Sequence, residues 1–111
     1  YTEALSGLAD FSHVEVVLYF HRAAAPAAAK IHPRGRDDLP LVGYFATRSP
    51  HRPNPIGVSA ARLIAIEGSV LTVEGLDAFD GTPILDIKPY LPRPDLVQNW
   101  LAKAQRAPHG P

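Results

Sequence analysis

Apolar and polar residues alternate between residues 11 and 21, whose sequence is FSHVEVVLYFH. Side chains of an extended strand point to opposite faces in turn, so Val14, Val16, Leu18 and Phe20 fall on one face. The other face carries a mixture of polar, aromatic and apolar side chains. This period of two, in a segment rich in β-branched and aromatic residues, predicts a strand with one face in a hydrophobic core.

Apolar runs separated by glycine and proline predict four more strands. They cover residues 41–48 (LVGYFATR), 57–68 (GVSAARLIAIEG), 69–76 (SVLTVEGL) and 84–91 (ILDIKPYL). Gly68 provides the tight turn between the second and the third of them. Short strands with such turns are typical of an antiparallel sheet that closes into a barrel or stacks as a sandwich. The pattern therefore predicts one mostly β domain over residues 1–111.

Two segments break the strand pattern. Residues 23–29, AAAPAAA, are interrupted by Pro26 and are predicted to form a flexible connector. Residues 93–105, RPDLVQNWLAKAQ, begin with Pro94 and Asp95, which suit the first turn of a helix, and continue with an apolar stripe. They predict a short C-terminal helix.

Composition excludes several classes of protein. The chain has 111 residues, 46% of them hydrophobic and 20% charged, which suits one globular domain. Eleven basic residues balance eleven acidic ones, so an anionic partner would have to be held by a local patch. The absence of cysteine excludes disulfides and cysteine-rich zinc sites. No apolar run is long enough to cross a membrane and no secretory signal is visible, so we expect a cytoplasmic protein.

The most unusual stretch is residues 43–57, GYFATRSPHRPNPIG. Ser49, Arg52 and Asn54 each precede a proline. Each proline fixes its own φ angle and also pushes the residue before it to extended geometry, so the backbone of this stretch has few conformations. Arg48 and Arg52 carry planar guanidinium groups that suit a carboxylate or a phosphate. The stretch is therefore either a stiff connector or a rigid bracket that holds donors against a ligand. Its PHRP segment also fits the minimal P-x-x-P pattern of peptides that recognition domains bind.

Other polar residues give weaker signals. Asp77 and Asp80 flank the turn DAFDGTP, where aspartate and glycine favour a tight turn without any ligand. Asp86 and Lys88 share one face of the next strand and are expected to form a surface pair. The five histidines are scattered, so we expect no metal site. No glycine-rich dinucleotide or phosphate-binding loop is present.

Two long motifs nevertheless resemble a known family. HPRGRDDLPLVGYFATRSPHRPNPIGVSAARL and VEGLDAFDGTPILDIKPYLP, preceded by GLADFSHVEVVLYFH, are similar to the TsaA-like family, also called YaeB or TrmO. The resemblance implies a single antiparallel β-barrel and a homodimer. It also implies an S-adenosylmethionine-dependent methyltransferase that modifies N6 of threonylcarbamoyladenosine beside the anticodon of tRNA. Members of the family begin with a further strand, and we expect that strand to be missing before Tyr1.

The resemblance also implies where the methyl donor binds. The family's donor contacts fall on the end of the first strand, the proline-rich stretch and the following turn. These residues are His21, Arg22, Arg48, Val58, Asp80, Gly81, Thr82 and Pro83.

The substrate and the proton acceptor are less constrained. A threonyl carboxylate suits a bidentate arginine, for which Arg34 and Arg52 are the candidates, and Asn54 offers both a donor and an acceptor to the same substrate. Basic residues between positions 30 and 52 form a local strip that suits tRNA phosphates. The proton acceptor is unknown. His21 and His51 are candidates because histidine titrates near neutrality, and Asp86 is a weaker one.

An alternative from another class stays open. The same barrel can be a non-catalytic module that binds S-adenosylmethionine or recruits a partner. The expected absence of the first strand favours this alternative, whereas the complete ATRSPHRPNPIG and DGTPILDIKPY motifs favour the enzyme.

Overall fold

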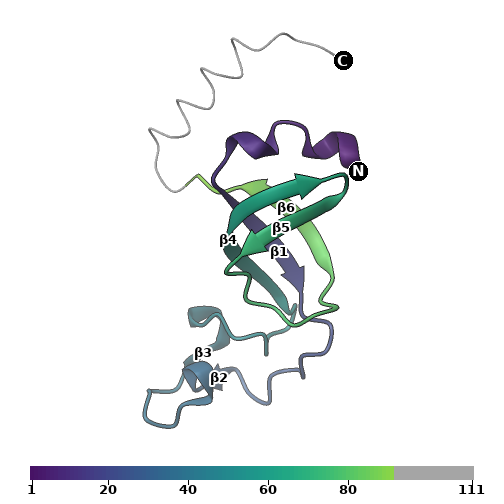
Figure 1. The fold of residues 1–111 in the computed structure, drawn as a ribbon. Coiled ribbons are helices and arrows are strands. Elements are labelled where there is room, and N and C mark those ends of the chain that lie inside the picture. Colours follow the sequence, from purple (N-terminus) through teal and green to yellow (C-terminus); the bar gives the residue numbers. More distant parts are fainter. Residues whose placement is uncertain (92–111) are drawn as a thin grey trace.

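Strands dominate the computed structural model, which describes residues 1–91; the expected C-terminal helix at residues 93–105 lies outside this part of the chain. A four-stranded antiparallel sheet has the order β5-β4-β1-β6, and a two-stranded sheet pairs β2 with β3 (Figure 1). The strands are β1 (His13–Tyr19), β2 (Lys30–Ile31), β3 (Val42–Gly43), β4 (Ile56–Glu67), β5 (Val70–Glu74) and β6 (Ile84–Pro89). Four short 3-10 helices complete them: η1 (Thr2–Leu5), η2 (Leu8–Asp10), η3 (Pro33–Gly35) and η4 (Tyr44–Ala46).

The core is centred on β1. Val14, Val16 and Leu18 are almost completely buried, at 0%, 3% and 1% exposure, and Phe20 packs against them beyond the end of the strand. β1 lies between β4 and β6, and hydrophobic side chains of other strands, among them Leu63, Val73 and Ile87, pack against its buried face. The predicted alternation over residues 11–21 is therefore confirmed.

β4 connects the two halves of the sheet. Residues 56–62 pair with β1, and residues 62–67 pair with β5 through a register shift between Leu63 and Ala65 that leaves Ile64 without a partner in this ladder. The shift changes the direction of the strand, as a bulge does. The hairpin from β4 to β5 turns at Gly68, whose φ is +62°, as the sequence predicted. On the opposite side, β6 pairs with β1 through another shift, at Leu85.

The expectation of a closed barrel is wrong for residues 1–91. β5 and β6 are the two edges of the four-stranded sheet and do not pair with each other. A closed sheet must satisfy both edges by pairing, and even the small five-stranded barrels have more strands than this sheet. The mostly β, antiparallel fold is confirmed, but the sheet is open.

The strand predicted at residues 41–48 is also mostly wrong. Only Val42 and Gly43 pair in a sheet, and the chain then turns into η4. Thr47 donates to the carbonyl oxygen of Tyr44 twice, from its backbone nitrogen at 3.2 Å and from its hydroxyl at 2.8 Å. This side-chain bond stabilises a turn in place of a sheet ladder, which an alternating pattern of apolar residues does not reveal.

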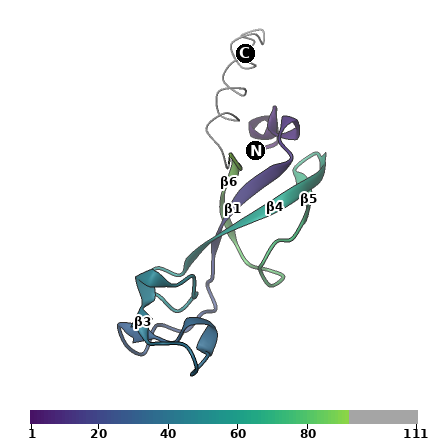
Figure 2. The same ribbon diagram turned by 90° about the vertical axis from the view of Figure 1, so that its left-hand side faces the viewer.

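The small β2–β3 sheet lies beyond one end of the larger sheet in both views (Figures 1 and 2). The chain reaches it after β1 and returns to β4 through the proline-rich stretch. Inspection of residues 1–91 finds no helix with the length and apolarity that a membrane span requires.

Candidate ligand-binding site

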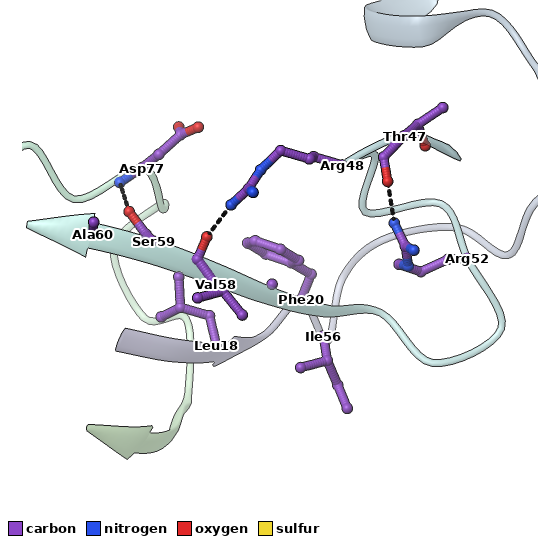
Figure 3. Close-up of a pocket in the computed structure, with 11 residues that line it drawn as sticks. Leu18, Phe20, Thr47, Arg48, Arg52, Ile56, Val58, Ser59, Ala60 and Asp77 are labelled. Atoms are coloured by element: carbon purple, nitrogen blue, oxygen red, sulfur yellow. Dashed lines mark hydrogen bonds between the residues drawn. The ribbon is translucent and has the colours of Figure 1, made fainter. Parts of the chain in front are cut away.

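The site begins where the proline-rich loop, residues 47–55, meets the start of β4. A cavity of about 370 Å³, here called the strand pocket, opens at this junction. Figure 3 shows Arg48 and Arg52 reaching toward it from the loop, with Asp77 at its far end. Its lining consists of Leu18, Phe20, Thr47, Arg48, Arg52, Ile56, Gly57, Val58, Ser59, Ala60 and Asp77.

Hydrogen bonds hold the loop against the strand. Nη2 of Arg48 donates to the carbonyl oxygen of Val58 on β4 at 2.6 Å. Nη1 of Arg52 donates to the carbonyl oxygens of Thr47 at 2.9 Å and Ser49 at 3.1 Å. One arginine thus ties the loop to the sheet, and the other fixes the curvature of the loop itself. The arrangement matches a rigid bracket better than a solvated connector.

A second cavity of about 310 Å³, here called the turn pocket, lies between the end of β1 and the turn before β6. Thr82 closes that turn by donating to the carbonyl oxygen of Phe79, from its nitrogen at 3.2 Å and from its hydroxyl at 2.7 Å. The hydroxyl therefore keeps only acceptor capacity for a ligand. The lining is Phe20, His21, Arg22, Ala23, Pro50, His51, Phe79, Asp80 and Thr82.

Phe20 is the wall that the two pockets share. Its backbone nitrogen donates to the carbonyl oxygen of Pro55 at 2.7 Å, and its ring lies directly over Gly57. A Cβ at residue 57 would lie 2.1 Å from Cε2 of Phe20, closer than any packed carbon contact. Glycine is required here because the backbone of β4 is in direct contact with the aromatic ring.

His51 has a defined tautomer in this setting. Its Nδ1 lies 2.9 Å from the carbonyl oxygen of Ala24. A carbonyl oxygen only accepts, so Nδ1 carries the proton, and Nε2 of the neutral ring is left as a proton acceptor. The imidazole contributes to the turn pocket, and its bond to Ala24 ties the proline-rich loop to the chain that leaves β1.

Six of the eight predicted donor residues divide between the two pockets. Arg48 and Val58 line the strand pocket, whereas His21, Arg22, Asp80 and Thr82 line the turn pocket. Gly81, at a φ of +85°, and Pro83 shape the turn without lining either pocket, and the carbonyl oxygen of Pro83 accepts from Tyr19 at 3.0 Å.

The other candidates lie in different places. Arg52 lines the strand pocket, whereas Arg34 lies in η3 of the small sheet region and lines neither pocket. Asn54 is exposed, and its backbone oxygen accepts from Ile56 at 2.7 Å. Asp86 lies on β6, outside both pockets, with an oxygen 2.8 Å from Nζ of Lys88, so the expected surface pair is confirmed.

This pair changes the acidity of Asp86. The Lys88 ammonium, followed by the backbone nitrogen of Ile87, holds the pKa of the Asp86 carboxyl below its usual value, and Asp86 in turn raises the pKa of Lys88. A carboxylate with a lowered pKa is a weaker base, so Asp86 is poorly suited to accept a proton near neutrality.

Several lining residues were not predicted from the sequence. Phe20 ends the apolar stripe of β1 and sits beside His21, but its role as a shared wall depends on a contact with Gly57, far away in the chain. Asp77 was assigned only to a turn; the structure adds that its nitrogen donates to Oγ of Ser59 at 3.2 Å, which brings it to the strand pocket. For residues 1–91 no group of three or more metal-ligating side chains occurs.

Fold and site together define a small antiparallel β domain with two pockets beside a proline-rich loop and a strand-connecting turn. Residues 1–96 match the family described as the tRNA-methyltransferase O N-terminal domain. The chain belongs to this family, so the resemblance inferred from its motifs is confirmed.

Individual relatives agree with this assignment. The chain is 41% identical over 107 residues to a probable S-adenosyl-L-methionine-binding protein of Pyrococcus abyssi, covering 93% of this chain and 56% of the relative. It is 45% identical over 97 residues to the mouse tRNA (adenine(37)-N6)-methyltransferase, covering 86% of this chain but 22% of that protein. The crystal structure of TrmO from Pseudomonas aeruginosa superposes with a TM-score of 0.63 at 37% identity, covering 99% of this chain and 40% of that one. The chain thus spans about half or less of these relatives.

The contact between Phe20 and Gly57 predicts the effect of a single methyl group. Gly57→Ala should force the ring of Phe20 out of its position and lower the free energy of unfolding by about 1–3 kcal/mol. Gly43→Ala is the matched control, because its added Cβ would meet only the oxygen of Ala29 at 3.9 Å. Denaturant unfolding measures stability, and carbon NMR of labelled phenylalanine follows the ring. An unmoved Phe20 signal in Gly57→Ala would contradict the assigned contact.

The ion pair on β6 predicts a titration shift. Lys88→Met should raise the pKa of Asp86 toward the usual aspartate value, whereas the pKa of Asp38, which is lowered mainly by its hydrogen bond from Arg36, should not change. Because the folded-state pKa of Asp86 is lowered, the pair stabilises the fold above the usual carboxyl pKa and stops doing so as the pH falls through the lowered value. Carboxyl carbon NMR measures both residues. A pKa of Asp86 that ignores the substitution would rule out Lys88 as its main cause.

Proposed function

We propose that this chain binds S-adenosylmethionine along the strand and turn pockets and transfers its methyl group to N6 of an adenosine in tRNA. The observation that carries the proposal is that residues from three separate segments converge around Phe20. Cationic, anionic and aromatic groups all contribute, and each pocket has the volume of a small-molecule site. The names of the relatives, which include S-adenosylmethionine-binding proteins and tRNA (adenine(37)-N6)-methyltransferases, support this choice.

The residues present suit the chemistry of this donor. Arg22 offers a guanidinium to its carboxylate, and Asp80 offers a carboxylate to its ammonium or sulfonium group. The aromatic faces of Phe20 and Phe79 suit the adenine ring and a neighbouring cation. When bound, the donor supplies a methyl group on a positively charged sulfur. The loop and the turn hold their groups in place beforehand, which lowers the entropy lost on binding.

The chain must also orient the acceptor and receive a proton. N6 of threonylcarbamoyladenosine is a poor nucleophile, since its lone pair is delocalised into the ring and the carbamoyl group. The N6–C bond forms as the S–C bond breaks, and the N6 proton passes to a base. We assign this role to Nε2 of His51, because its Nδ1 already donates to Ala24 and the ring lines the turn pocket. His21 in the same pocket is the second candidate.

Arg52 is our choice for the threonyl carboxylate. Its Nη1 is engaged with two backbone carbonyls, which fixes the guanidinium and leaves Nε and Nη2 to donate to a ligand. Arg34 lines neither pocket and is more suited to a phosphate farther along the RNA. A tRNA substrate also favours a cytoplasmic location.

Two extensions follow from the family and the open sheet. Within residues 1–91, the outer edges of β5 and β6 pair with no further strand, and these strands carry exposed apolar residues, among them Val70, Ile84 and Leu85. Such edges favour association, so we include a homodimer in the proposal.

A non-catalytic domain that only binds S-adenosylmethionine is the second candidate function, because the Pyrococcus relative is named only for binding. A methyl-transfer assay with radiolabelled donor separates the two.

The bond from Arg48 to Val58 predicts a loss of donor binding. Arg48→Ala leaves the loop untied from β4 and removes a charged hydrogen bond, so donor affinity should fall by about tenfold or more. Arg62→Ala is the matched control. Arg62 lies on β4, the strand of Val58, forms an ion pair with Glu74 at 3.5 Å and lines neither pocket. Isothermal titration calorimetry with S-adenosylmethionine measures both variants. Equal affinity in Arg48→Ala and in the unsubstituted chain would remove Arg48 from the site.

The assignment of Arg52 and His51 predicts a requirement for the modified base. tRNA with threonylcarbamoyladenosine beside the anticodon should accept a methyl group, whereas the same tRNA without the threonylcarbamoyl group should not. The carboxylate is the partner of Arg52, and the carbamoyl group makes the N6 proton easier to remove. Transfer of radiolabelled methyl to the two tRNAs is compared at equal concentration. Equal turnover would refute the proposed substrate, and absence of transfer to both, with donor bound, would favour the non-catalytic alternative.

A further inference from the structure

Phe45 is an exposed aromatic residue next to Arg52, which lines the strand pocket. It lies in η4, two residues before Thr47, and 78% of it is accessible to solvent. Its ring meets the ring of Tyr44 edge-on, with centroids 4.7 Å apart and an interplanar angle of 86°. The guanidinium carbon of Arg52 lies over the same ring, 6.0 Å from its centroid. Isolated exposed apolar side chains are common, but the ring of this one has both an aromatic and a cationic neighbour.

The segment beneath Phe45 is rigid. The nitrogen of Tyr44 donates to the carbonyl oxygen of Ala29 at 3.0 Å, and the oxygen of Tyr44 accepts from Thr47 twice. Arg52 is held in turn by the carbonyl oxygens of Thr47 and Ser49. The backbone that carries the ring and the planar cation beside it are thus both held before any ligand arrives, which lowers the conformational entropy lost on contact.

The charge around Phe45 selects the kind of partner. In the part of the chain that the structure describes, the salt bridges involve Arg36, Arg62 and Lys88, whereas Arg48 and Arg52 form none. An apolar protein surface that covered Phe45 would also bury the Arg52 charge without a counter-ion, which is costly. A tRNA loop provides an unpaired base for the ring of Phe45 and, on the neighbouring modified adenosine, the carboxylate proposed above for Arg52, so it satisfies both groups together.

We propose that Phe45, with Arg52 beside it, is a stacking platform for an unpaired base of RNA, next to the adenosine that enters the site. The inference rests on the proposed RNA substrate and adds a residue that no donor or acceptor contact requires. Arg52 connects the pocket with the proposed platform, because it lines the strand pocket and its guanidinium lies over the ring of Phe45. Stacking on an aromatic side chain is tolerant of sequence, so Phe45 positions the loop rather than reading its bases.

The test uses the chain itself and an RNA hairpin with the sequence of an anticodon stem and loop, carrying 2-aminopurine in place of the base beside the target adenosine. Binding is followed by fluorescence anisotropy, and stacking by quenching of 2-aminopurine. Phe45→Leu should weaken binding by about 5- to 150-fold and abolish the quenching, because leucine keeps apolar volume but loses the ring. Phe45→Tyr should retain both. The salt dependence of binding should not change in either variant, since no phosphate contact is lost.

Two further measurements separate the possible outcomes. Donor affinity by calorimetry should be equal in all three proteins, because Phe45 lines neither pocket. If the unsubstituted chain binds the hairpin and Phe45→Leu binds it equally well, the stacking role is overturned while the proposed function stands. If the unsubstituted chain binds donor but no RNA, the RNA substrate and the stacking role both fail. If Phe45→Leu changes only the mass in equilibrium sedimentation, the residue contacts a second copy of the chain and the inference is wrong.

Discussion

The contact between the ring of Phe20 and the backbone of Gly57 positions everything else in the site. It brings the end of β1 and the start of β4 together at the point where both strands leave the sheet. The proline-rich loop enters β4 immediately before Gly57, and the chain that leaves Phe20 continues into His21 and Arg22. Both pockets therefore share one aromatic wall, and a side chain larger than glycine at residue 57 would move that wall.

The proline-rich loop is rigid for two reasons that act together. The prolines restrict the backbone locally, and Arg48, His51 and Arg52 connect the loop to β4, to Ala24 and to itself through backbone carbonyls. Each of these bonds engages only one nitrogen atom of the side chain. Arginine has five N–H donors and a neutral histidine keeps one free nitrogen, so the same residues can brace the loop and still contact a ligand.

The charge distribution fits the proposed reaction. The chain as a whole is neutral, but the cations that form no salt bridge in the described part include Arg48 and Arg52, beside the strand pocket. Asp86, in contrast, is paired with Lys88 and lies outside the pockets. An anionic partner would therefore be attracted by these local positive charges and not by the net charge of the chain. The exposed ring of Phe45 lies next to Arg52.

The sequence by itself determined the strands at residues 11–21, 57–68, 69–76 and 84–91, the turn at Gly68 and the family, because alternation, turn glycines and long motifs are local signals. It could not reveal the turn in residues 41–48, since a threonine side chain there competes with sheet pairing. It also could not reveal that the sheet remains open over residues 1–91, that six of the eight predicted donor residues divide between two pockets, or that Phe20 is the wall that these pockets share. Each of these depends on which distant segments come into contact, and such contacts are decided by packing and register in the tertiary structure rather than by the order of residues along the chain.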